Sequence, residues 1–190
     1  MSSHHIIREN QEPALFIAAP HSLADDYLNQ LLEWSPTVIT LSEHYELLKS
    51  REIKIDVILD NQALDPALLE ENLTLIPYST SYWQTLFDYL QDKKNFAVYI
   101  INDQVSKNEL EAYLTTFTII LLKDNQKFMF LKKYEKWHPK GNILEISDLD
   151  QKAESLSNLD PIGNNSYQVI EDGFVSIPEQ DDFLLIAEEL

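Results

Sequence analysis

The first two-thirds of the sequence alternates short apolar segments with segments whose apolar residues recur at helical spacing. Each short segment is apolar at consecutive positions, which is typical of strands that are covered on both faces. Strands that alternate with helices form a parallel sheet through right-handed crossovers. We therefore predict an α/β fold, a three-layer αβα domain with a mostly parallel six-stranded sheet. The predicted strands lie at residues 14–19, 37–41, 56–60, 73–78, 96–101 and 116–122, and the predicted helices at 21–34, 42–48, 65–72, 81–93 and 106–114.

Four of the predicted helices carry a recognisable start signal. In three of them a Ser is followed three residues later by an acidic or amide side chain, which is the pattern of a capping box. The fourth begins at a Pro, which fits the first turn of a helix. The signals are Ser22 with Asp25, Ser81 with Gln84, Ser106 with Glu109, and Pro66.

The pattern changes after a turn signal at residues 123–127. Five short strand candidates follow without helices between them, and residues such as Asn125 and Gly173 supply turn chemistry. We predict a small antiparallel, sandwich-like β domain that contains a long polar connection at residues 147–165. The predicted domains are residues 1–124 and 125–190. His138, beside Trp137, is expected at a turn on the edge of the second domain.

Glycine usage excludes the usual backbone sites for phosphate. The chain has three glycines, at 141, 163 and 173, and none in the first 140 residues. A phosphate cradle needs backbone that approaches the phosphates closely, often at positive φ. The sequence therefore carries neither a Walker loop nor a dinucleotide fingerprint.

The charge of the chain limits its partners. The net charge is −18, so nucleic acid and anionic membranes are poor partners. Residues 148–190 alone contain 11 acidic side chains and one Lys. This acidic region is either a solubilising surface or a surface that binds a cation or a protein partner.

The chain is expected in the cytoplasm. It has no cysteine, which excludes disulfides and thiolate chemistry and suits a reducing compartment. It shows no signal peptide and no apolar run long enough to cross a bilayer.

Polar residues follow several predicted strands at the point where each strand ends. The carboxyl ends of parallel strands meet at one edge of a sheet, where ligands usually bind. Each of these residues also has a structural interpretation, as a turn former or a helix cap. We assign no catalytic residue and no metal ligand. The candidate positions on this edge are Asp60, Asn61, Thr80, Ser81, Asn102 and Asp103.

Three stretches carry a resemblance to a known family. The stretch IKIDVILDNQAL, residues 53–64, is similar to the I-K-P-D-L-I-I-G-D-x-D-S pattern of the thiamine pyrophosphokinase family. The stretch TSYWQTL, residues 80–86, lies where that family has T-D-x-x-x-A-L. Residues 171–190 resemble the closing β-hairpin of the family. The segment 101–109 lies where the family has G-G-R-x-D-H and keeps none of its glycines.

The resemblance implies an activity, its cofactors and an assembly. The family transfers pyrophosphate from ATP to thiamine, uses Mg²⁺ held by aspartates, and works as a homodimer with thiamine near the subunit interface. In this chain the aspartate positions are Asn61, Ala63 and Ser81. An amide is a weak Mg²⁺ ligand and a methyl group is none.

Three hypotheses about function follow. In the first, the chain is an active, divergent thiamine pyrophosphokinase that uses Mg²⁺ and ATP. In the second, it is a non-catalytic relative that binds thiamine, a nucleotide or a protein. A different enzyme on the same architecture is the third. Aromatic residues at 82, 83 and 137 are expected in the core or in the interface of a homodimer.

Overall fold

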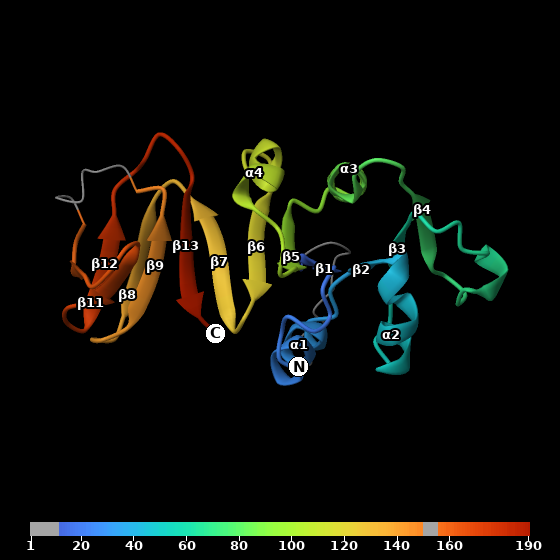
Figure 1. Cartoon of the computed structure of the whole chain (residues 1–190), viewed down its shortest axis with the longest axis horizontal. Coiled ribbons are helices and arrows are strands. Elements are labelled where there is room, and N and C mark those ends of the chain that lie inside the picture. The colour runs from blue at the N-terminus through green and yellow to red at the C-terminus, as the bar shows by residue number, and fades with distance from the viewer. Residues whose placement is uncertain (1–11, 150–155) are drawn as a thin grey trace, which may run out of the picture. The chain divides into compact units, whose positions relative to one another are not determined.

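The structure is a computed structural model that describes residues 12–149 and 156–190 (Figure 1). The chain forms two compact units, which divide between Thr118 and Ile119. The predicted boundary at residues 124 and 125 lies in the turn at the end of strand β6 (Thr118–Lys123), whereas the units divide at the start of this strand. The domain boundary at residues 124 and 125 remains a prediction.

The first unit is built on a parallel sheet. Its strands are paired in the order β5-β1-β2-β3-β4, and every pair is parallel. All residues of the three central strands are buried, as expected for a sheet covered on both faces. The strands are β1 (Ala14–Ile17), β2 (Val38–Leu41), β3 (Val57–Asp60), β4 (Thr74–Pro77) and β5 (Ala97–Ile101).

Helices cover both faces of this sheet. Figure 1 shows α1 and α2 on one side and α3 and α4 on the other. The chain runs from β1 outward to β4 and then returns to β5 on the opposite side of β1, so right-handed crossovers place the later helices on the other face. The predicted α/β class is confirmed. The helices are α1 (Asp25–Glu33), α2 (Tyr45–Ser50), α3 (Tyr82–Asp92) and α4 (Lys107–Leu110), with 3-10 turns η1 (Ser42–His44), η2 (Pro66–Leu68) and η3 (Glu111–Tyr113).

Aromatic packing fixes α3 on the sheet. Trp83 is buried, and its ring centroid lies 5.8 Å from that of Phe16 on β1. The ring of Phe87, one helical turn later, packs against that of Phe117, with the two ring centroids 4.8 Å apart. The core placement expected for Trp83 is confirmed.

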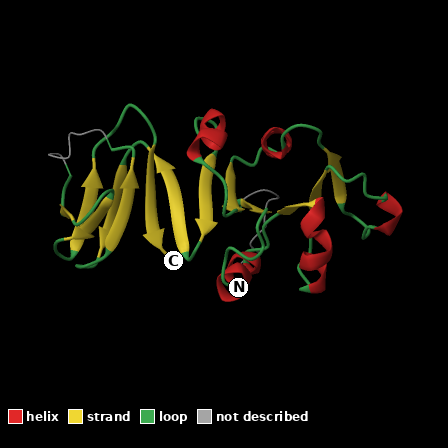
Figure 2. Ribbon diagram, in the orientation of Figure 1, coloured by secondary structure: helices red, strands yellow, loops and turns green. Residues whose placement is uncertain are grey.

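The strands of the second unit pair antiparallel. Six of its strands lie in the order β10-β11-β9-β13-β7-β6, and a separate two-stranded sheet pairs β12 with β8 (Figure 2). Residues of both sheets form one apolar core, so the predicted sandwich-like arrangement is present. The strands after β6 are β7 (Gln126–Leu131), β8 (Tyr134–His138), β9 (Ile143–Ser147), β10 (Leu159–Pro161), β11 (Ser166–Val169), β12 (Gly173–Ile177) and β13 (Leu184–Glu189).

A buried polar network in the second unit corrects the expectation for His138. This residue lies within β8 and is buried, because alternate residues of that strand face the core. Its Nε2 lies 2.6 Å from the Tyr134 hydroxyl, which donates to Glu188 at 2.5 Å. Lys136 donates to the other oxygen of Glu188, and Asn142 lies 3.4 Å from Nδ1 of His138. The network joins β8 to the C-terminal strand.

The helix starts agree with the sequence in part. The capping box of Ser106 and Glu109 is confirmed. The box of Ser81 and Gln84 is wrong, because the Ser81 side chain makes no capping hydrogen bond. The Ser22 signal is wrong as well, because its hydroxyl donates back to a carbonyl at 2.9 Å and the helix begins at residue 25.

Two segments differ in extent from the prediction. The segment that begins at Pro66 forms only a single 3-10 turn, in which the Asp65 carboxylate accepts the amide of Ala67. The predicted connection at 147–165 contains β10, which pairs with β11, and residues 150–155 of it lie outside the described residues. None of the helices in the described part of the chain has the length and apolar composition needed to span a bilayer.

Candidate functional site

The six predicted positions lie at the carboxyl ends of β3, β4 and β5. Because these strands are parallel in one sheet, their ends open at the same edge. Asp60 and Asn102 are buried at this edge, whereas Asn61, Thr80, Ser81 and Asp103 are exposed. Two of the six positions are therefore buried and four are exposed.

The Asp60 carboxylate is occupied by its own loop. One oxygen accepts the backbone amide of Gln62 at 2.8 Å, and the other accepts that of Leu64 at 2.9 Å. Burial acts to raise the pKa of Asp60, but hydrogen bonds from Gln62, Leu64 and Ser42 outweigh it and lower the pKa. Asp60 is thus an ionised group that holds the loop after β3.

This loop contains a strained residue. Ala63 has a φ of 55°, a left-handed conformation that disfavours residues with a Cβ atom. The hydrogen bonds to Asp60 on either side of Ala63 keep the backbone in this conformation. The neighbouring Asn61 accepts a weak hydrogen bond from the Ser42 hydroxyl at 3.5 Å.

Asn102 has a comparable role after β5. Its Oδ1 accepts the amide of Gln104 at 2.8 Å, and its Nδ2 donates to the Tyr82 hydroxyl at 3.4 Å. The amide side chain therefore shapes one loop and contacts the first residue of α3. Both buried candidates combine the turn-forming role with a place at the sheet edge.

Two tyrosines complete the edge. The rings of Tyr78 and Tyr82 meet edge to face, with centroids 6.1 Å apart. Burial raises the pKa of Tyr78, and the negative charges of Glu43 and Asp60 raise it further. Burial also raises the pKa of Tyr82. We call Glu43, Asp60, Tyr78, Tyr82 and Asn102 the tyrosine rim.

Sequence reasoning missed part of this rim. Tyr78 ends the segment predicted as the fourth strand, so the rule that selected Asp60 and Asn102 would have selected it as well. Glu43 follows β2 inside a 3-10 turn and carried no signal of its own.

The residues at the rim do not fit a magnesium–polyphosphate site. Mg²⁺ in such sites is held by carboxylate oxygens that are free to coordinate. At the positions expected for these carboxylates the chain has Asn61, Ala63 and Ser81, and both oxygens of the adjacent Asp60 accept backbone amides. Within residues 12–149 and 156–190, no group of three or more acidic or His side chains could hold a metal ion.

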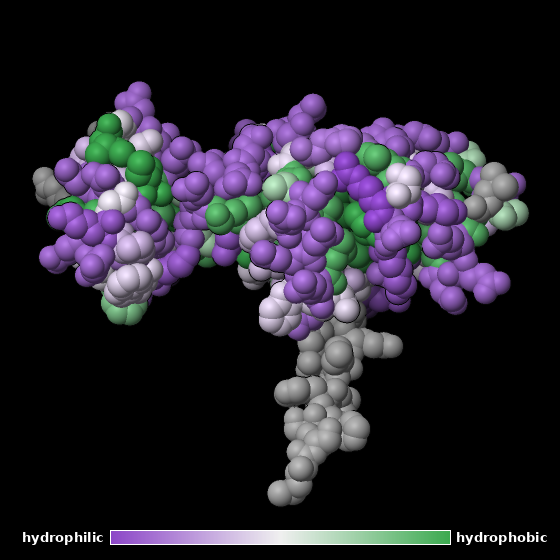
Figure 3. Space-filling view, turned by 90° about the horizontal axis from the view of Figure 1, so that it is seen from below, coloured by the Kyte–Doolittle hydropathy of each residue, from purple (hydrophilic) through white to green (hydrophobic). Residues whose placement is uncertain are grey.

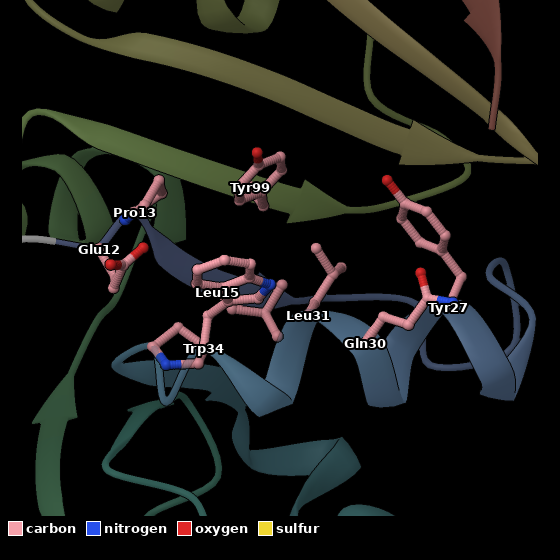
Figure 4. A pocket seen from close by; sticks show the side chains of 9 residues that line it. Glu12, Pro13, Leu15, Tyr27, Gln30, Leu31, Trp34 and Tyr99 are labelled. Carbon is pink, nitrogen blue, oxygen red and sulfur yellow. The ribbon is translucent and has the colours of Figure 1, made fainter.

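A groove elsewhere on the first unit was not predicted. It has a volume of about 360 Å³ and lies between α1 and the strands β1 and β5 (Figure 4). Tyr99 of β5 lies on one side, and Tyr27 and Leu31 of α1 lie on the other. Figure 3, which views the molecule from the side of α1 and α2, shows hydrophobic residues exposed among hydrophilic ones.

Comparison with solved structures defines the fold. A thiamine pyrophosphokinase from Bacillus subtilis matches 94% of this chain and 99% of its own, with a TM-score of 0.66 and 11% identity. A thiamin pyrophosphokinase from Geobacillus thermodenitrificans matches 94% of this chain and 98% of its own, with a TM-score of 0.62 and 8% identity. A thiamin pyrophosphokinase family protein from Enterococcus faecalis matches 94% of this chain and 99% of its own, with a TM-score of 0.61 and 12% identity.

The protein is therefore an α/β protein with an appended antiparallel β region. More particularly, it has the thiamine pyrophosphokinase fold over nearly its whole length. At these identities the similarity shows the fold alone. Comparisons with protein-family models and with curated protein sequences found no match.

Proposed function

We propose that this chain uses the thiamine pyrophosphokinase fold to bind a small organic cation of the thiamine type at the tyrosine rim, without transferring pyrophosphate. The observation that carries the proposal is the state of Asp60. Its two oxygens accept the amides of Gln62 and Leu64, so the carboxylate beside Asn61 and Ala63 already holds the loop, and those two positions supply no carboxylate of their own. Pyrophosphoryl transfer needs metal-held phosphates, because positioning and charge neutralisation supply most of its catalysis.

The charges of the rim favour a cation. Burial raises the pKa of Tyr78, and the negative charges of Glu43 and Asp60 nearby raise it further, which is consistent with an edge that attracts a cation. Aromatic faces attract organic cations, and nearby carboxylates add to the attraction. Thiamine carries a positively charged ring, and the solved structures that share this fold include enzymes named for it.

A direct assay separates binding from transfer. The protein is incubated with Mg-ATP and thiamine, and AMP and thiamine diphosphate are measured by mass spectrometry, with the B. subtilis enzyme as positive control. We expect no product above the protein-free level and measurable thiamine binding by calorimetry. Product formation at many turnovers would refute the proposal and support the alternative, an active diphosphotransferase that uses Mg²⁺ and ATP.

Variants place the binding on the rim. Tyr78→Leu is expected to weaken thiamine binding by about tenfold through loss of an aromatic contact. Tyr89→Leu, on α3 away from the rim, serves as control. A combined Asn61→Asp, Ala63→Asp and Ser81→Asp variant is expected to gain magnesium binding that the natural chain lacks. Equal magnesium affinity of the two proteins would contradict our interpretation of these three positions.

We also propose that the protein is a cytoplasmic homodimer. Trp137 on β8 and Phe174 on β12 are register partners, and they are 53% and 63% exposed. An exposed aromatic pair is typical of a surface that another molecule covers. Light scattering tests the assembly: the natural chain should have twice the mass of a monomer, and a Trp137→Ser/Phe174→Ser variant should have the monomer mass.

A further inference from the structure

The groove lies within the first unit, between helix α1 and the strands β1 and β5. Strand β5 pairs with β1 on the side away from β2, and residues of α1 and β5 line the groove together. Tyr99, in the middle of β5, is only partly buried and faces the groove. The apolar surface between α1 and β5 is therefore open within the first unit.

Helix α1 turns an aromatic face toward this opening. Tyr27, Leu31 and Trp34 recur at the i, i+4, i+7 spacing that places residues on one side of a helix. Leu28 is the only buried residue of α1. The other apolar residues of the helix are packed less completely, and Tyr27 and Leu31 border the groove. Trp34 is 69% exposed, and the rise of the helix separates it from Tyr27 by about 10 Å.

The lining carries negative charge and no positive charge. Glu12 is the one charged side chain among the residues known to line the groove, and the other polar side-chain groups are Gln30, the tyrosine hydroxyls and the indole N–H of Trp34. Asn95 donates a hydrogen bond to the backbone carbonyl of Glu12 at 3.1 Å, which holds the main chain of this residue beside the groove. In Figure 4, Glu12 and Trp34 lie toward one end of the groove and Tyr27 toward the other.

We infer that the groove binds a flat, aromatic organic cation, with the positive charge beside Glu12 and Trp34 and the flat body along Leu31 and Tyr99. Tryptophan is the strongest aromatic partner for a cation, and a carboxylate beside it selects charge over a neutral ring. The volume of about 360 Å³ falls within the range of small-molecule sites. The net charge of −18 raises the local concentration of cations.

The groove shares no residue with the tyrosine rim, so this inference goes beyond the function proposed there and does not depend on it. Neither site needs the other to be occupied. A probe that binds only the rim will leave Trp34 unperturbed, and a probe that binds only the groove will be insensitive to Tyr78→Leu.

A matched pair of probes tests the inference on the full-length protein. The cation 1-methylquinolinium is compared with quinoline, which has the same flat shape and is neutral at neutral pH. Binding is measured by calorimetry and by the indole N–H signals of the three tryptophans in two-dimensional NMR. We expect the cation to bind at least about fivefold more tightly and to shift the signal of Trp34 rather than those of Trp83 and Trp137.

Variants separate the charge from the ring. Glu12→Gln is expected to weaken binding of the cation by about fivefold and to leave quinoline unchanged, and Trp34→Ala to weaken both probes by about tenfold. Glu33→Gln and Phe96→Ala are the matched controls, because both side chains are exposed and neither lines the groove, and thermal melts confirm that each variant folds. The inference is overturned if the two probes bind equally, if neither binds at millimolar concentration, or if the controls lower affinity as much as the groove variants.

Discussion

The Tyr134 hydroxyl is the group on which the buried network of the second unit depends. It donates to Glu188 at 2.5 Å and accepts from Nε2 of His138, so one hydroxyl satisfies two buried side chains. Tyr134→Phe keeps the ring in the core and removes only this oxygen. The variant leaves one carboxylate oxygen and one imidazole N–H without their partner.

The size of the effect follows from these two losses. A buried polar group left without its partner costs about 1–3 kcal/mol. Glu188 keeps its bond from Lys136, so its own penalty falls at the low end. We therefore expect Tyr134→Phe to lower the free energy of unfolding by about 3 kcal/mol, a large share of the roughly 5–15 kcal/mol of a typical protein.

The assay is urea denaturation followed by circular dichroism, with hydrogen exchange to locate the change. Exchange should accelerate in β8 and β13, which the network joins. Tyr167→Phe is the control, because Tyr167 packs against the same core and the described residues give its hydroxyl no hydrogen-bond partner. The reasoning would be refuted if Tyr134→Phe lowered the free energy of unfolding by less than about 1 kcal/mol, or if Tyr167→Phe lowered it by an equal amount.

Three further predictions follow from the contacts described above. Burial lowers the pKa of His138, so the folded state takes up its proton later than the unfolded chain as pH falls. Unfolding free energy should therefore decline from about pH 6.5 downward, and His138→Gln should flatten this decline in pH-dependent melts. Asp60→Ala should cost about 1–3 kcal/mol by thermal denaturation, because the amides of residues 62 and 64 lose their acceptor, whereas Asn61→Ala should change stability by less than about 0.5 kcal/mol. Glu109→Ala breaks the capping box of α4 and should cost about 1 kcal/mol in the same melts, against no change for the exposed Glu111→Ala.

The strands could be predicted because their signal is local. A run such as Val57 to Leu59 needs cover on both faces wherever it lies, and the parallel sheet supplies it. The helix caps depend instead on geometry that neighbouring turns impose. The Ser22 hydroxyl and the Ser22 amide both donate to the carbonyl of Ala19, so this residue closes the preceding turn and does not cap the helix. The β10 strand was missed because three residues within a polar segment carry too short a pattern.

The candidate site shows the same limit at the level of function. The sequence predicts where Asp60 and Asn102 lie, because a polar residue after a buried strand must reach the edge of the sheet. It does not predict what the side chains bind, since the partners of Asp60 are amides two and four residues later in a loop of unusual conformation. The groove could not be predicted from any single segment, because Glu12, Trp34 and Tyr99 come from three separate parts of the chain.

The contacts of the edge residues show which positions at the edge the fold itself depends on. Asn61, Thr80, Ser81 and Asp103 are exposed, so their identities contribute little to the stability of the sheet. The core depends on apolar runs and on α3, none of which needs a carboxylate at the edge. Asp60 is different, because its charge is required by the loop that it holds. The fold thus constrains the one acidic side chain that builds the edge, and it leaves open the positions at which a magnesium ion would be held.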